Sequence, residues 1–184
     1  MKLQEIYDIL NEISPFELQE KWDNAGLLVG SFEDEINNIY ISIDLDEELL
    51  SKVEKNSLII THHPLIFSGL KRVNFDTYST KLLKELIKKD ISLISMHTNI
   101  DKTHLNKYVA EEILGFKVAN SKEFISYCDV NMSFDELVKY VSSKLNLKTT
   151  NAVRCNDFIK KIAIITDSCS DLKEEYRKEN NIFV

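Results

Sequence analysis

Three of the four histidines in this sequence lie in two short segments whose residue types suit metal chemistry. Residues 61–64 read THHP, and residues 97–101 read HTNID. Imidazole nitrogens combined with a carboxylate form a donor set that suits Zn, Mn, Fe or Co better than Mg or Ca. Adjacent side chains in an extended segment point to opposite faces, so His62 and His63 would rarely bind the same ion. The spacing therefore favours two neighbouring divalent ions.

Structural roles explain the same residues without a metal. A pair of histidines at a strand end is also expected when one ring is buried and hydrogen-bonded and the other is solvated. Asp101 has the position of an N-cap for a helix that follows His97. His104 falls inside the helix predicted for residues 104–114, where we expect a solvated side chain. Spacing alone leaves both interpretations open for His97 with Asp101 and for the histidine pair.

Apolar segments place both histidine segments at the ends of predicted strands. Residues 57–61 (SLIIT) and 91–96 (ISLISM) are short apolar runs, and residues 77–89 between them predict a helix. This order indicates a partly parallel sheet with the histidines at its carboxyl edge, where sites gather in such folds. Residues 36–45 alternate isoleucines with polar residues like a half-buried strand, and residues 46–56 read as a helix.

The later part of the chain repeats this α/β character more weakly. A capping box that begins at Ser133 opens a predicted helix. Strands are predicted near residues 149–155 and 161–166, and a last helix at residues 171–180.

The segment at residues 22–30 (WDNAGLLVG) predicts a turn with two glycines. Such a turn closes the backbone around a pocket, with Asp23 and Asn24 supplying hydrogen bonds. The alternative is a capped turn that buries Trp22 in the core.

Composition excludes several classes of protein. The 23 basic and 30 acidic residues give a net charge of −7, and no glycine-rich phosphate loop is present. An acidic chain without a basic cluster lacks the main source of affinity for nucleic acid, so we expect no nucleic-acid partner. No apolar run approaches about 18 residues and no signal peptide is recognised, so we expect no membrane partner and a cytoplasmic protein.

Three segments together strongly resemble the NIF-three-like family: WDNAGLLVG at residues 22–30, ITHHPLIF at residues 60–67 and SMHTNID at residues 95–101. Its members are often described as GTP cyclohydrolase I type-two homologues. The resemblance implies an α/β protein of two intertwined, similar α/β subdomains with mixed sheets covered by helices. On this basis residues 1–125 form the first subdomain and residues 126–184 a partial second one. It also implies two divalent metal ions and a homo-oligomer, often a hexamer of three dimers.

The family's metal roles carry over to the residues that match. His62 is expected to bind one ion and His63 with Asp101 the other. His97 is expected to lie beside the ions, as a neighbour of a ligand or as a proton-transfer group. Family members complete the site with a late segment that carries a histidine and a glutamate, and this sequence has no histidine after His104. We therefore expect an incomplete site, in a chain that is either truncated or a natural short form.

Two functions follow from the sequence. The first is a metal-dependent hydrolase in which two cations lower the pKa of a bridging water, acting on a nucleotide or another small polar molecule. The second is a non-enzymatic metal-binding or scaffold protein with an incomplete site, which the missing ligands favour.

Overall fold

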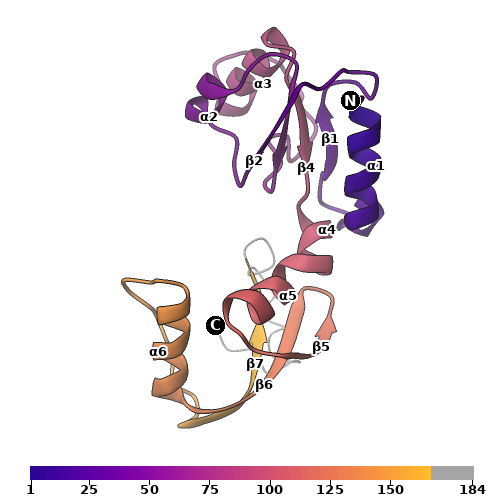
Figure 1. Ribbon diagram of the computed structural model, residues 1–184. Helices are drawn as coiled ribbons and strands as arrows, with labels where there is room; N and C mark the ends of the chain where they lie inside the picture. Colours follow the sequence, from indigo (N-terminus) through magenta and orange to yellow (C-terminus); the bar gives the residue numbers. More distant parts are fainter. Residues whose placement is uncertain (167–184) are drawn as a thin grey trace. The chain divides into compact units, whose positions relative to one another are not determined.

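The computed structural model describes residues 1–166, and the chain divides into two compact units at Ile100 (Figure 1). The first unit comprises residues 1–100, and the second begins at Asp101. The subdomain boundary expected between residues 125 and 126 rests on the family resemblance and stays a prediction. The helix expected at residues 171–180 lies outside the described residues.

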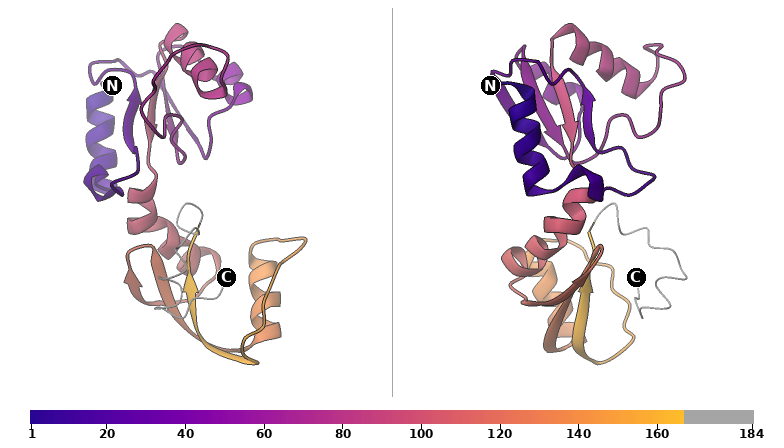
Figure 2. Two further views of the ribbon diagram at one scale, coloured as in Figure 1. Left: turned by 180° about the vertical axis from the view of Figure 1, so that it is seen from behind. Right: turned by 90° about the vertical axis from the view of Figure 1, so that its right-hand side faces the viewer.

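In the first unit, a four-stranded sheet has helices on both faces (Figure 2). Its elements in chain order are α1 (Leu3–Ile13), η1 (Phe16–Leu18), β1 (Gly26–Val29), β2 (Asn38–Ser42), α2 (Glu47–Lys52), β3 (Ser57–Thr61), α3 (Tyr78–Lys88), β4 (Ser92–Ser95) and α4 (Thr98–Ile100).

The strand order in this sheet is β1-β4-β3-β2. Strands β2, β3 and β4 are parallel, with Ile60 opposite Ile41 on one side and Ile94 on the other, whereas β1 is antiparallel to β4. The prediction of a partly parallel sheet is therefore confirmed. Because parallel strands end at the same edge, the residues after β2, β3 and β4 meet there.

Alternate residues of the central strands belong to two cores on opposite faces. Ile59 and Leu93 pack with α2 and α3, and Leu58 and Ile94 pack with α1. All four side chains are fully buried, as expected for parallel strands covered on both faces.

Strand β2 is an edge strand with an exposed apolar face. Ile39, Ile41 and Ile43 are exposed, and Ile41 is 81% accessible, whereas Tyr40 packs against the core of α2 and α3. The alternation at residues 36–45 indicates a half-buried strand, but the half that faces water is the isoleucine half. Among the described residues, α1 packs with the central strands and leaves these isoleucines uncovered.

The second unit contains a three-stranded antiparallel sheet in the order β5-β6-β7. Its described elements are η2 (Asp101–Leu105), α5 (Asn106–Tyr108), η3 (Val109–Ile113), β5 (Val118–Lys122), β6 (Ile125–Ser133), α6 (Phe134–Lys144) and β7 (Phe158–Ile164). The capping box at Ser133 is confirmed. The strand predicted near residues 149–155 is wrong, because this segment has no regular structure. None of the described helices combines the length and the apolar character needed to cross a membrane.

The two isoleucines at positions 59 and 41 provide a matched test of this fold. We expect Ile59→Ala to lower the free energy of unfolding by about 2–5 kcal/mol, because it leaves a cavity in a core where the side chain is fully buried. Ile41→Ala should change it by less than about 0.5 kcal/mol. Urea denaturation followed by circular dichroism measures both, and equal losses would contradict the assignment of the buried face.

Candidate metal centre

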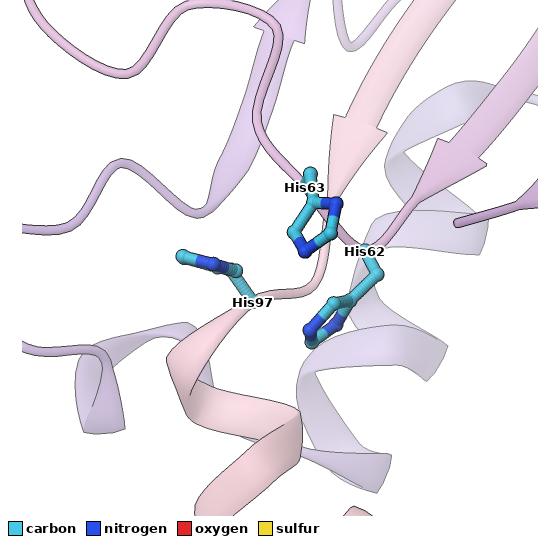
Figure 3. Close-up of side chains that lie close together, drawn as sticks. All are labelled: His62, His63 and His97. Carbon is cyan, nitrogen blue, oxygen red and sulfur yellow. The ribbon is translucent and has the colours of Figure 1, made fainter. Parts of the chain in front are cut away.

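Three histidines meet at the carboxyl edge of the four-stranded sheet (Figure 3). His62 and His63 follow β3 directly, and His97 lies between β4 and α4. Backbone hydrogen bonds fix the histidine pair beside the end of β2, since the His63 N–H donates to the carbonyl of Ile43 over 3.0 Å. Segments far apart in the sequence thus deliver imidazoles to one place.

The rings of His62 and His63 lie close together. The backbone bends at both residues immediately after β3, and the ring centroids are 4.9 Å apart. The His97 ring lies 5.2 Å from that of His62 and 5.8 Å from that of His63. The expectation that the paired side chains point to opposite faces assumed an extended segment, and the bend removes that condition.

Each of the three rings has its Nδ1 atom in a hydrogen bond to an oxygen. His62 Nδ1 is 3.0 Å from the carbonyl oxygen of Met96, and His63 Nδ1 is 2.7 Å from the Asp44 carboxylate. His97 Nδ1 is 2.7 Å from the Asp23 carboxylate. Carbonyl and carboxylate oxygens only accept hydrogen bonds, so Nδ1 is the donor in every ring. In the neutral imidazole, Nε2 then presents its lone pair, as a metal ligand must.

Asp23 is the most constrained of these oxygen acceptors. Its carboxylate is fully buried and also accepts hydrogen bonds from the Thr98 hydroxyl, the Thr98 N–H and the Asn24 N–H. Burial by itself raises the pKa of this group, but the hydrogen bonds from His97, Thr98 and Asn24 outweigh burial and lower the pKa to about 2. Asp23 is therefore an anion at neutral pH, and it fixes the orientation of His97.

The three histidines fit a divalent metal ion. One ligand atom from each lies within 4.8 Å of the others. Nitrogens on one tetrahedral zinc at about 2.0–2.1 Å lie roughly 3.4 Å apart, so a single ion would require the rings to close by at most roughly 1.4 Å. The hydrogen-bonded Nδ1 atoms are also the outer contacts that metal-binding histidines commonly make.

The two other residues considered from the sequence lie in the second unit. Asp101 is buried at the start of η2, four positions after His97 in the chain, and its role as a ligand stays a prediction. His104 is exposed, as expected, with Nδ1 close to the Thr103 hydroxyl.

Sequence reasoning missed the carboxylate partners of the histidines. Asp23 was expected to supply hydrogen bonds, but its partner His97 lies 74 positions away and no spacing signals that pair. No sequence pattern singles out Asp44, which follows β2, as a partner of His63. The alternative that buries Trp22 in the core is wrong, because this side chain is 53% exposed.

Fold and site together define an α/β protein with a candidate histidine metal centre at the carboxyl edge of a mixed sheet. The chain belongs to the Duf34/NIF3 (NGG1p interacting factor 3) family, whose model matches residues 1–184. This result confirms the family resemblance and the α/β fold class expected from the sequence.

Curated relatives and solved structures agree with this membership. The chain is 51% identical to a GTP cyclohydrolase 1 type 2 homolog from Campylobacter jejuni over 94% of this chain and 72% of that protein. It is 42% identical to a GTP cyclohydrolase 1 type 2 from Helicobacter pylori over 90% of this chain and 69% of that protein. The crystal structure of a Staphylococcus aureus hypothetical protein matches with a TM-score of 0.82 and 24% identity, over 98% of this chain and 76% of that chain, which supports the fold.

Nuclear magnetic resonance tests the hydrogen-bond pattern without any metal. In metal-free protein near pH 8, we expect the Nδ1-protonated tautomer at His62, His63 and His97, because the oxygen acceptors of these Nδ1 atoms cannot donate. Long-range ¹H–¹⁵N spectra distinguish the two tautomers. The exposed His104 provides a solvated reference signal. An Nε2-protonated ring at any of the other three positions would contradict the geometry.

Proposed function

We propose that this chain is a metal-dependent hydrolase acting on a nucleotide or a similar small polar molecule. The observation that carries the proposal is the convergence of three imidazoles whose Nδ1 atoms are all held by oxygen acceptors. The names of the Campylobacter and Helicobacter relatives refer to GTP cyclohydrolase, and they support a nucleotide substrate for this chain.

The proposed ligands come from the edge of the sheet and from the residues that follow it. We propose that the chain binds two divalent ions of Zn, Mn, Fe or Co. His62 would bind one ion, and His63 and Asp101 would bind the other. We add His97 to the ligands, because one of its ring nitrogens lies within 4.8 Å of a ring nitrogen of each of the paired histidines. The proton-transfer role predicted for His97 is the alternative. When bound, such an ion acts as a Lewis acid and makes water nucleophilic near neutral pH.

The chain's own groups orient the donors. The Met96 carbonyl and the carboxylates of Asp44 and Asp23 hold the three rings in the tautomer that presents Nε2. The side chains of Asp23 and His97 are both buried, so water cannot compete for the hydrogen bond between them. The Asp44 side chain is 67% exposed, so the His63 ring that it contacts is held less rigidly than the His97 ring. These contacts prepare the site before any ligand arrives.

Metal content and turnover test the proposal directly. We expect protein purified without chelator to contain a divalent transition metal by emission spectrometry and to hydrolyse GTP. His63→Ala should lower both the metal content and the rate at least about 10-fold, because a ligand is lost. His104→Ala is the matched control, since it removes an exposed histidine outside the cluster.

The outcomes of this experiment separate the two functions. Metal bound through His63 without turnover on a panel of nucleotides and phosphoesters would favour the non-enzymatic metal-binding or scaffold protein. Equal metal content in His63→Ala, His104→Ala and the unmodified protein would contradict the ligand assignment itself.

Replacement of the two carboxylates tests how the donors are oriented. Asp23→Asn should weaken metal affinity about 10- to 100-fold, because the buried amide no longer fixes the His97 tautomer. Asp44→Asn should have a smaller effect, since water can replace a hydrogen bond at an exposed position. Competition with a fluorescent chelator measures both constants. An equal or larger loss in Asp44→Asn would contradict the dominant role of Asp23.

Assembly and location complete the proposal. We propose a homo-oligomer, a hexamer as the family resemblance implies, in the cytoplasm.

A further inference from the structure

Two exposed aromatic side chains border the buried His97. Trp22 precedes Asp23, and Phe67 lies in the segment between β3 and α3. Their ring centroids are 5.9 Å apart, and they lie 6.4 Å and 6.3 Å from the His97 ring. Both rings are nearly perpendicular to the imidazole, at 83° and 86°. About half of each side chain remains accessible to solvent.

Hydrogen bonds link the neighbours of both aromatic residues to the candidate metal centre. The Asn24 amide donates to the carbonyl of Ile66 over 2.5 Å, which joins the turn at Trp22 to the segment of Phe67. The same turn holds His97 through Asp23. The backbone next to each aromatic ring is therefore connected to the imidazole through hydrogen bonds.

Isolated exposed apolar residues are common on proteins, but this arrangement is more specific. Two aromatic rings in mutual contact beside a group of convergent polar atoms are typical of small-molecule sites. Phe75 offers a contrast in the same segment, because it is similarly exposed but lies beneath the Lys84 ammonium, 4.6 Å from its ring centroid.

The spacing of the rings decides how a planar ligand can bind. A ring inserted between two others needs about 7 Å between their centroids, twice the contact distance of roughly 3.5 Å. The observed 5.9 Å and the tilt of 39° leave too little room. Trp22 and Phe67 therefore offer a joint platform on which a planar ring can stack, and stacking of a nucleobase on an aromatic side chain is worth about 1–3 kcal/mol.

Two basic residues in the segment of Phe67 favour an anionic group on the ligand. Lys71 and Arg72 follow Phe67 in the same exposed segment, and neither forms an ion pair within the described part of the chain. Such side chains pair readily with phosphate, and Arg does so through two parallel hydrogen bonds.

We propose that Trp22 and Phe67 form a stacking platform for the heteroaromatic ring of a phosphorylated ligand, with Lys71 and Arg72 binding its phosphate. The ligand class is a nucleotide. The inference deepens the proposed function, on which it rests for the identity of the site, and it assigns recognition of the ring to two residues outside the metal ligands.

Intrinsic fluorescence provides a direct test, because Trp22 is the only tryptophan in the sequence. Metal-free protein is titrated with GTP, guanosine and inorganic tripolyphosphate under excitation at about 295 nm, with free N-acetyltryptophanamide as the optical control. We expect GTP to quench the fluorescence in a saturable way. Guanosine should also quench it but bind more weakly, and tripolyphosphate should not quench it.

Matched variants assign the contacts. Phe67→Leu should weaken GTP binding about 5- to 150-fold, in line with the loss of one stacking contact, whereas Phe75→Leu should leave it unchanged. The double variant Lys71→Gln, Arg72→Gln should weaken binding of GTP but not of guanosine, and it should reduce the dependence on salt concentration.

The failures of this inference and of the proposed function are distinguishable. Saturable quenching by GTP in an unmodified protein that binds no metal and shows no turnover would overturn the hydrolase and support the platform. Metal binding with no quenching by GTP would overturn the platform, as would equal effects of Phe67→Leu and Phe75→Leu.

Discussion

The buried hydrogen bond between Asp23 and His97 is the contact on which the candidate site most depends. It joins the turn before β1 to His97, between β4 and α4, and it forces one tautomer on the imidazole. The same carboxylate accepts hydrogen bonds from Thr98 at the start of α4. One buried anion therefore contacts both His97 at the sheet edge and the first residue of the helix. Trp22 takes its place beside the site because its neighbour is fixed in this way.

The three histidines differ in how firmly they are held. His97 is buried against a buried carboxylate, and His62 is tied to a backbone carbonyl, whereas His63 relies on the exposed Asp44. A site of this kind combines a rigid member with an adjustable one. That combination suits a donor set that must close on a cation without rearranging the sheet, because the motion can be confined to side chains after β3.

Local pattern was sufficient to predict much of the first unit. The apolar runs before His62 and His97 correspond to β3 and β4, and the parallel pairing follows from the helices between the strands. What could not be predicted depends on contacts between distant residues. The Asp23–His97 pair spans 74 positions, and the bend at His62 and His63 is set by hydrogen bonds to the end of β2. The exposure of the isoleucine face of β2 could not be predicted either, because alternation shows that one side of a strand is apolar but not whether a helix covers that side.

The row formed by Ile39, Ile41 and Ile43 has a practical consequence for handling the protein. Edge strands normally carry charged side chains or proline, which disfavour pairing with strands of other molecules. Strand β2 has neither within Asn38–Ser42. Concentrated preparations should therefore lose material through irregular sheet-to-sheet contacts sooner than the acidic composition suggests. A single lysine introduced at position 41 would act as a gatekeeper that keeps the chain dispersed, at little expense to the fold.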